Sequence, residues 1–401
     1  MRWRQYTPKW RNNQMEKVGL ILTGGGARAA YQVGVLKAVA ELMPRRARNP
    51  FQVICGTSAG ALNAATLAVN AHSFRKGVRY LDSIWKNFHP NQIYRTDVLG
   101  VLNNSVLWLA GLVMSALGIR KLKHVSLLDN SPLSQFLEEV LPCEKIQEVI
   151  DAGLLHALSI TASGYGSGQS VTFYQGAEEI TPWRRTGRIG IPAKIEIKHL
   201  MASASLPFLF HPTLINREYF GDGSMRQIAP IGSALHLGAT RVLVVGVTVN
   251  DTAGHVQRRD MHEYPTLAQI AGHALNSIFL DNMDVDLERV KKINDLVAIM
   301  PAEMRASTNL KHVDVMVISP SQPIDQIAER YVRELPWTIR LLLRLVGVKH
   351  HSGITLVSYL LSESKYCRAL IDLGYQDAMN RREEMMTFLD ISPSQDAELP
   401  Q

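Results

Sequence analysis

The chain has 401 residues, of which 46% are hydrophobic and 20% are charged, and its formal net charge is +7. These proportions are typical of a folded globular protein and exclude an intrinsically disordered chain. The length allows one large domain or two.

The positive charge is concentrated in the first 17 residues, where the acid is Glu16 and the cations are Arg2, Arg4, Lys9, Arg11 and Lys17. Trp3, Tyr6 and Trp10 are interleaved with these cations. The arm could therefore contact an anionic lipid surface or nucleic acid. A solvated terminus is the alternative interpretation.

Cys55, Cys143 and Cys367 are too few and too scattered for a disulfide framework or a zinc cluster, which favours a reducing compartment. No apolar segment typical of a signal peptide follows the N-terminal cations. We therefore expect a cytoplasmic location, with peripheral contact to a membrane as an option.

The first elements alternate between strand and helix. Lys17–Thr23 reads as a buried strand, Ala30–Leu42 as a helix, Phe51–Cys55 as a second strand and Ala59–Val69 as a helix of small residues. This alternation predicts an α/β fold with a mostly parallel central sheet.

The longest apolar stretch, Val98–Ile119, follows these elements, and its uninterrupted part is Val106–Ile119. That part is shorter than the roughly 20 residues of a spanning helix. Arg120, Lys121 and Lys123 come next. The pattern fits either an interfacial membrane helix or a buried core helix.

Strand patterns return in the second third of the chain. Ala157–Ala162 and Gln169–Tyr174 predict a hairpin, and residues 193–206 look helical. Leu214–Phe220 is a candidate strand that leads into Gly221-Asp222-Gly223, and Arg241–Val249 is the clearest strand.

Beyond residue 250 the pattern changes to charged amphipathic helices, with one more strand predicted at Val313–Ser319. Trp337–Lys349 mixes arginines with leucines and could lie on a membrane or pack on the domain. We divide the chain into a basic aromatic arm (1–16), a main α/β domain (17–250), a mainly helical extension packed on the same domain (251–391) and a frayed tail (392–401).

The first motif with chemical meaning is Gly56-Thr57-Ser58-Ala59-Gly60, which lies between an apolar strand and a helix pattern. This is the pattern of a nucleophile elbow, where Gly56 and Gly60 permit a tight turn that exposes Ser58 at a helix N-terminus. The helix end favours developing negative charge. A plain glycine turn with Ser58 as N-cap is the alternative.

The second motif, Gly24-Gly25-Gly26-Ala27-Arg28-Ala29, has two interpretations. A dinucleotide fingerprint would need an acid at the end of the second strand, but that strand runs directly into Gly56 and Glu41 lies in the preceding helix. As an oxyanion hole, successive backbone amides would point at a carbonyl oxygen, which contributes on the order of 3 kcal/mol per donor. The oxyanion interpretation is preferred.

The third motif is Gly221-Asp222-Gly223-Ser224. An aspartate between glycines can approach another backbone closely, so Asp222 could reach Ser58. An Asx turn at the end of a strand is the alternative.

These three motifs, in this order, resemble the patatin-like phospholipase family, and Ala202–Phe208 is also similar to the family pattern. The resemblance covers roughly residues 17–250. It implies a three-layer α/β/α fold and a Ser–Asp dyad in place of a triad, with Ser58 as nucleophile and Asp222 as general base. It also implies hydrolysis of lipid acyl esters without a metal or another cofactor.

By the same resemblance, Gly24, Gly25, Gly26 and Arg28 would form or support the oxyanion hole. Two positions depart from the family pattern: Ala29 stands where many members have glycine, and Ser224 replaces the usual glycine or alanine. Both residues are small, so they bear on substrate preference more than on activity.

Free aspartate, with a pKa near 4, is a poor base toward serine unless an apolar pocket raises its pKa. Leu206, Phe208 and Phe210 are expected to supply that pocket. A histidine triad is the competing mechanism. His236, His255 and His273 follow Asp222, but none of these three lies in a recognisable loop motif.

The sequence therefore predicts a serine acyl hydrolase that cleaves phospholipid or lysophospholipid esters, with peripheral membrane contact and no nucleic-acid partner. A hydrolase of neutral glycerides, a non-catalytic lipid-binding scaffold and a nucleotide-dependent oxidoreductase are the alternatives.

Overall fold

The computed structural model describes residues 16–45, 47–97, 114, 126–227, 229–249, 266–308, 310–345 and 353–391. The basic arm before residue 16 and the tail after residue 391 lie outside the described residues. So does the apolar stretch Val98–Ile119, apart from Met114.

A ten-stranded mixed sheet forms the centre of the molecule, with the order β10-β9-β1-β2-β3-β4-β6-β5. Strand β8 pairs with β3, and β7 pairs with β8. Five of the strand pairs are parallel: β10–β9, β9–β1, β1–β2, β2–β3 and β4–β6. The strands are β1 (Val18–Leu22), β2 (Val53–Thr57), β3 (Ala157–Gly164), β4 (Ser170–Gly176), β5 (Trp183–Arg185), β6 (Arg188–Pro192), β7 (Thr213–Ile215), β8 (Glu218–Asp222), β9 (Arg241–Val245) and β10 (Asp314–Ile318).

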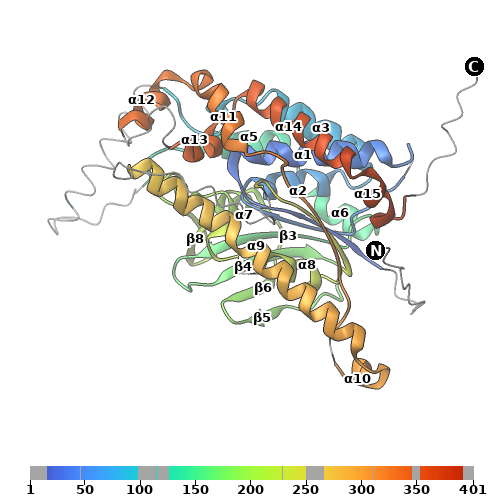
Figure 1. Cartoon of the computed structure of the whole chain (residues 1–401). Coiled ribbons are helices and arrows are strands. Elements are labelled where there is room, and N and C mark those ends of the chain that lie inside the picture. The colour runs from blue at the N-terminus through green and yellow to red at the C-terminus, as the bar shows by residue number, and fades with distance from the viewer. Residues whose placement is uncertain are drawn as a thin grey trace, which may run out of the picture.

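Helices cover both faces of this sheet (Figure 1). One face carries α1 (Ala30–Leu42), α2 (Ala59–Val69), α3 (Phe74–Lys86) and α14 (Ser364–Asn380); the other carries α8 (Pro230–His236) and the long α9 (Leu267–Ile299). The predicted three-layer α/β/α arrangement is confirmed.

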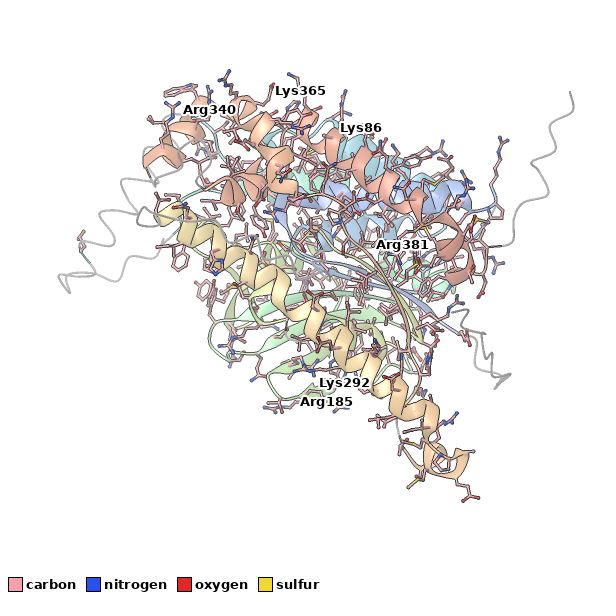
Figure 2. All side chains as sticks on the ribbon, viewed as in Figure 1. Lys86, Arg185, Lys292, Arg340, Lys365 and Arg381 are labelled. Atoms are coloured by element: carbon pink, nitrogen blue, oxygen red, sulfur yellow. The ribbon has the colours of Figure 1, made fainter. Side chains whose placement is uncertain are left out.

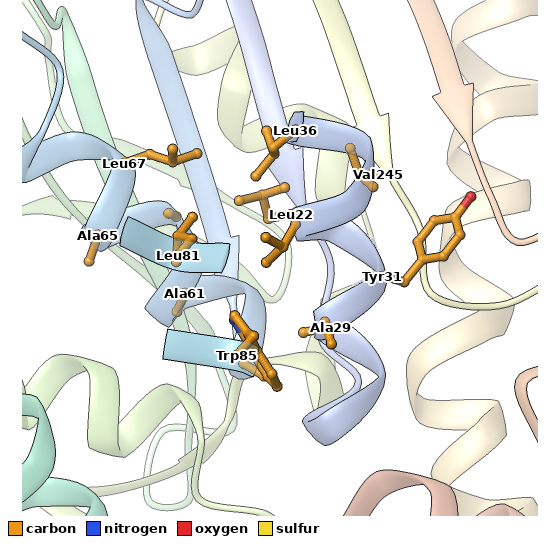
Figure 3. Close-up of a cluster of buried hydrophobic side chains, with 14 of the residues drawn as sticks. Leu22, Ala29, Tyr31, Leu36, Ala61, Ala65, Leu67, Leu81, Trp85 and Val245 are labelled. Atoms are coloured by element: carbon orange, nitrogen blue, oxygen red, sulfur yellow. The ribbon is translucent and has the colours of Figure 1, made fainter. Parts of the chain in front are cut away.

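The alternation of side chains along β1 explains the two cores. Leu20 and Leu22 belong to the larger core under α1, α2 and α3, whereas Ile21 between them belongs to the core under α8 and α9. In the larger core, Leu22 lies near Leu36 of α1 and Trp85 of α3 (Figure 3).

The other helices lie at the edges and ends of these layers. They are α5 (Ser131–Val140), α6 (Lys145–Asp151), α7 (Ile197–Ser203), α10 (Ala302–Ser307), α11 (Ile324–Tyr331), α12 (Trp337–Leu345), α13 (Ile354–Leu360) and α15 (Arg382–Phe388), with the short 3-10 turns η1 (Gly26–Ala29), η2 (Pro90–Gln92), η3 (Gly223–Arg226) and η4 (Val332–Glu334). In the part of the chain that the structure describes, no helix is long and apolar enough to cross a membrane.

Several predicted boundaries need correction. The single strand predicted at Leu214–Phe220 is the hairpin β7–β8, because Asn216 takes a left-handed φ of 55° and reverses the chain. The helix predicted over 193–206 is only the seven residues of α7. The strand predicted at Val313–Ser319 is confirmed as β10, which extends the sheet beside β9.

Candidate active site

The glycine loop and the Ser58 turn emerge at the same edge of the sheet, because they follow neighbouring parallel strands. Leu22 at the end of β1 is paired with Gly56 on β2. The two segments are in backbone contact: a Cβ on Gly60 would lie 2.2 Å from the carbonyl oxygen of Leu22. Glycine is therefore required at this position by the proximity of the two loops.

Ser58 has the strained backbone expected of a nucleophile elbow, with φ 54° and ψ −129°. This conformation costs on the order of 1–3 kcal/mol for a residue with a side chain. Ser203 helps to hold it: its hydroxyl accepts the Ser58 N–H at 2.8 Å and donates to the Thr161 carbonyl at 2.6 Å. Ser58 stands at the N-cap of α2 but its side chain makes no capping hydrogen bond. The Ser58 hydroxyl therefore does not accept the helix-capping hydrogen bond that the alternative interpretation requires.

Strand β3 brings Asp222 to this turn. Strand β4 pairs with one edge of β3, and both β2 and β8 pair with the other edge, one after the other along β3. β2 pairs with β3 as far as Thr161. From Ala162 onward β8 pairs with β3, and Ala162 lies opposite Asp222. The next residue, Gly223, is so close to β2 that a Cβ there would lie 2.9 Å from the Thr57 side chain.

Asp222 is fully buried, and its two carboxylate oxygens differ in their contacts. Oδ1 accepts the backbone N–H of Ser224 at 2.9 Å, which is the hydrogen bond of the Asx turn that was the alternative interpretation. Oδ2 accepts no hydrogen bond of normal length from a described residue. Burial raises the pKa of Asp222 to about 6, while the hydroxyl of Ser58 and the N–H of Ser224 act in the opposite direction. One oxygen therefore orients the carboxylate, and the other is available to take a proton beside Ser58.

The glycine loop continues from β1 into η1. Gly26 has a left-handed φ of 54°, and a Cβ there would lie 2.3 Å from the Tyr359 carbonyl oxygen. A Cβ on Gly25 would meet the Val247 side chain at 2.4 Å. Gly26 lines the pocket at Ser58, and Gly24 and Gly25 directly precede it in the loop.

Arg28 turns away from that pocket into the C-terminal helices. Its guanidinium is buried, donates from Nε to the Ser358 hydroxyl at 2.8 Å and pairs with Asp325 at 2.6 Å. It also lies 4.0 Å from the centre of the Tyr359 ring. In this arrangement Arg28 supports the glycine loop from behind.

A narrow apolar pocket of about 50 Å³ opens beside Ser58. Its wall is almost entirely aliphatic and aromatic. It is lined by Gly26, Ala27, Ser58, Ala59, Leu62, Trp85, Phe88, Ile93, Tyr94, Leu133, Ala204, Leu206, Phe210, Tyr359, Leu360 and Ser362. Leu206 and Phe210 line this pocket, but Asp222 is not among its lining residues, so their predicted effect on the pKa of Asp222 stays a prediction; the contribution expected of Phe208 is wrong. Phe208 has a φ of 66° and is 75% exposed, because the loop turns it outward between the buried Leu206 and Phe210.

No histidine lines the described wall of this pocket. His236 instead stacks on Trp183, with ring centres 4.8 Å apart, on the other face of the sheet. His255 lies outside the described residues. Within the described ranges, no group of three potential His, Cys, Asp or Glu metal ligands occurs either.

Sequence reasoning missed the supporting residues of this site. Ser203 lies in the Ala202–Phe208 segment, so its local pattern offered a signal. Tyr359, Leu360 and Ser362 offered none, because they are some 300 residues from Ser58 in the chain and are brought to it only by tertiary packing.

The fold and this geometry define an α/β protein with a serine on a strand-to-helix turn beside a buried aspartate. The family model of patatin-like phospholipases matches residues 20–235, which is more than half of the chain. The chain therefore belongs to the patatin-like phospholipase family.

Two curated relatives and one solved structure illustrate the similarity. A cGAMP-activated phospholipase from Pseudomonas aeruginosa is 25% identical over 217 residues, which are 54% of this chain and 55% of that protein. Lysophospholipase nte1 from Aspergillus terreus is 52% identical over 54 residues, which are 14% of this chain and 3% of that protein. The chain thus matches about half of the first relative and a small part of the second.

The structure of human GIVD cytosolic phospholipase A2, in complex with a methyl gamma-linolenyl fluorophosphonate inhibitor, is 11% identical. The match covers 94% of this chain and 59% of that chain, with a TM-score of 0.39.

Proposed function

We propose that this protein is a serine acyl hydrolase that acts on phospholipid or lysophospholipid esters. Ser58 is the nucleophile, Asp222 the general base, and the backbone amides of Gly24, Gly25 and Gly26 stabilise the oxyanion. The observation that carries the proposal is the strained Ser58 turn beside the buried Asp222 carboxylate, whose Oδ2 accepts no hydrogen bond of normal length from the described residues. Family membership supports the same reaction class.

In the first step, Asp222 Oδ2 takes the hydroxyl proton of Ser58 while Oγ attacks the ester carbonyl carbon. The tetrahedral oxyanion that forms is stabilised by the glycine loop and by the N-terminal end of α2. The alcohol portion leaves with the proton from Asp222, and the acyl group stays on Ser58. A water molecule, deprotonated by the same carboxylate, then releases the fatty acid. A pKa of about 6 makes Asp222 a better base than an exposed aspartate, yet leaves it ionised at neutral pH.

The pocket supports a lipid substrate. Its aliphatic and aromatic wall, which includes Leu206 and Leu360, matches the apolar surface of an acyl chain. Neutral glycerides carry the same chains, so they are the alternative substrates.

The decisive experiment is fatty-acid release from phospholipid and lysophospholipid vesicles by wild type, Ser58→Ala and Asp222→Asn. We expect both variants to lose at least about a thousandfold of the activity, as single losses from catalytic dyads and triads do. Ser159→Ala, at a buried serine of β3 outside the pocket, is the control and should stay active. A folded wild type that releases no fatty acid from any of these lipids, and whose Ser58 does not react with a fluorophosphonate, would refute the proposal. Unimpaired vesicle binding by all variants would then favour the non-catalytic lipid-binding scaffold.

We also propose that α12 contacts the membrane. Trp337 is 58% exposed and Leu341 48% exposed, and with exposed Arg344 they form one face of the helix, while Ile339 and Leu343 are buried. Arg340 lies at the same outer end of the molecule (Figure 2).

Sedimentation with vesicles that contain phosphatidylserine tests this contact. The double variant Trp337→Ala, Leu341→Ala should bind several-fold more weakly than wild type. Ile299→Ala is the matched control and should bind as wild type does. Ile299 is 80% exposed and lies at the C-terminal end of α9, the end that is far from α12. Equal binding by the double variant and wild type would exclude α12 as the contact.

A further inference from the structure

The pocket beside Ser58 is completed by a segment from the C-terminal part of the chain. Tyr359 and Leu360 at the end of α13, and Ser362 just after it, line the pocket together with Ser58. All three lie far beyond residues 20–235, which the family model matches. Part of the pocket wall therefore comes from a segment outside the residues that the family model matches.

The end of α13 is fixed to the glycine loop by direct backbone contact. Gly26 lies against the carbonyl of Tyr359, where even a Cβ would not fit. Leu360 is fixed from another side, because its carbonyl accepts the Tyr94 hydroxyl at 3.1 Å. Tyr359 donates from its own hydroxyl to Asn276 of α9 at 2.9 Å. The end of α13 thus contacts the glycine loop, Tyr94 and α9, and these three contacts fix its position.

A buried polar cluster reinforces this attachment. Arg28 donates to Ser358 of α13 and pairs with Asp325 of α11, and Thr355 of α13 donates to the other oxygen of Asp325 at 2.7 Å. The Arg28 residue is only 3% exposed, whereas the Asp325 side chain is 34% exposed. Loss of the carboxylate would leave a buried guanidinium without its ionic partner, which a fold tolerates poorly.

We propose that α13, held on the glycine loop by Arg28 and Asp325, determines which acyl chains this enzyme accepts, with Leu360 as the selecting side chain. This inference rests on the proposed hydrolase function. Arg28 is then a positioning residue: its Nε and Nη2 are engaged by Ser358 and Asp325, and its side chain does not line the pocket at Ser58.

Leu360 is 3% exposed and faces the pocket, so its size sets the space left for a chain. Leu360→Ala enlarges this space and should favour longer chains, whereas Leu360→Phe should favour shorter ones. A hydrophobic pocket discriminates by about tenfold or more for each methylene that does not fit. Leu361, the next residue, is also fully buried but does not line the pocket, which makes Leu361→Ala the matched control.

The test is the rate at which Ser58 reacts with alkyl fluorophosphonates of short, medium and long chain. We expect the ratio of long-chain to short-chain rates to rise about tenfold in Leu360→Ala and to fall in Leu360→Phe. The ratio should not change in Leu361→Ala. A ratio is insensitive to the amount of folded protein. Leu360→Val, which removes one methylene, serves as the second variant if Leu360→Ala does not fold, and its ratio should also rise.

Asp325→Asn tests the attachment of α13. It should slow the reaction of every probe about tenfold and weaken the selection by chain length, and Asp325→Glu should restore part of both. Glu334→Gln, which removes an acid paired with Lys365 on the surface, is the control and should leave both unchanged.

Reaction of Ser58 with unchanged chain-length ratios in all Leu360 variants would overturn this inference and leave the hydrolase proposal intact. Absence of any reaction in folded wild type would instead overturn the hydrolase proposal, and this inference with it.

Discussion

Asp222 is fully buried, and this location affects both stability and reactivity. Its pKa in the folded protein is about 6, against 3.8 for an aspartate exposed to water. A carboxyl group whose pKa rises on folding favours the fold when it is protonated. That contribution is fully present below about pH 4 and is lost as the pH rises to and beyond about 6. The difference in pKa corresponds to roughly 3 kcal/mol of stability lost at neutral pH.

We therefore predict that Asp222→Asn stabilises the fold at pH 8 by roughly 2–3 kcal/mol and has little effect near pH 4. In the same pH range the kcat/KM of wild type should rise through an apparent pKa near 6 and then level off, because only the ionised carboxylate accepts a proton. Urea unfolding of both proteins and a pH–rate profile of wild type measure these effects. Asp286→Asn removes another buried carboxyl group with a raised pKa and should leave the pH–rate profile unchanged. Equal stabilities of Asp222→Asn and wild type at pH 8 would contradict the argument.

At the scale of elements, the glycine loop between β1 and α1 depends on a contact that its own sequence does not reveal. Gly26 combines a left-handed φ with close contact to the Tyr359 carbonyl, whereas Gly153, with a φ of 67°, has open space around the position of a Cβ. The two glycines thus separate the cost of the backbone conformation from the cost of the steric contact.

Gly153→Ala should lose only about 1–2 kcal/mol of stability, which is the cost of a left-handed residue with a side chain. Gly26→Ala should lose clearly more and should also slow the reaction of Ser58, because the loop must move away from α13. Thermal unfolding and fluorophosphonate labelling measure the two effects. Similar losses in both variants would show that the contact with Tyr359 contributes nothing.

The elements that could be predicted from the sequence are those encoded by a few consecutive residues. Ala30–Leu42 and Ala59–Val69 are helices with the predicted bounds, and the turn at Ser58 has the strained backbone that its flanking glycines indicate. The orientation of Phe208 and the split of β7 from β8 depend on single residues with positive φ, which alternating patterns do not reveal. The pocket wall from α13 depends on chain packing over some 300 residues and has no local signal.

At the scale of the whole molecule, α14 joins the C-terminal extension to the family domain. It lies along α1 on one face of the sheet (Figure 1). Gly34 of α1 and Gly374 of α14 allow the two backbones to touch: a Cβ on Gly34 would lie 2.0 Å from the Ile371 carbonyl oxygen, and one on Gly374 would lie 2.1 Å from the Tyr31 carbonyl oxygen. Since α13 directly precedes α14, this contact also supports the wall of the active-site pocket.

The last prediction concerns Gly374→Ala. Alanine in place of glycine normally stabilises an exposed helix by about 1 kcal/mol. Here we expect the opposite sign, a loss of about 2–3 kcal/mol, because the new methyl group meets the backbone of α1, which cannot turn aside as a side chain can. Gly232→Ala in α8 is the matched control and should be neutral or stabilising, because a Cβ there would meet the flexible end of Arg188 at 3.0 Å and the Ala229 Cβ at 3.8 Å, an ordinary contact. Urea unfolding gives both values, and fluorophosphonate labelling of Ser58 in Gly374→Ala should decline together with the folded fraction. A stabilised Gly374→Ala protein would mean that α14 can separate from α1 without loss, and that the extension is less firmly attached than this contact implies.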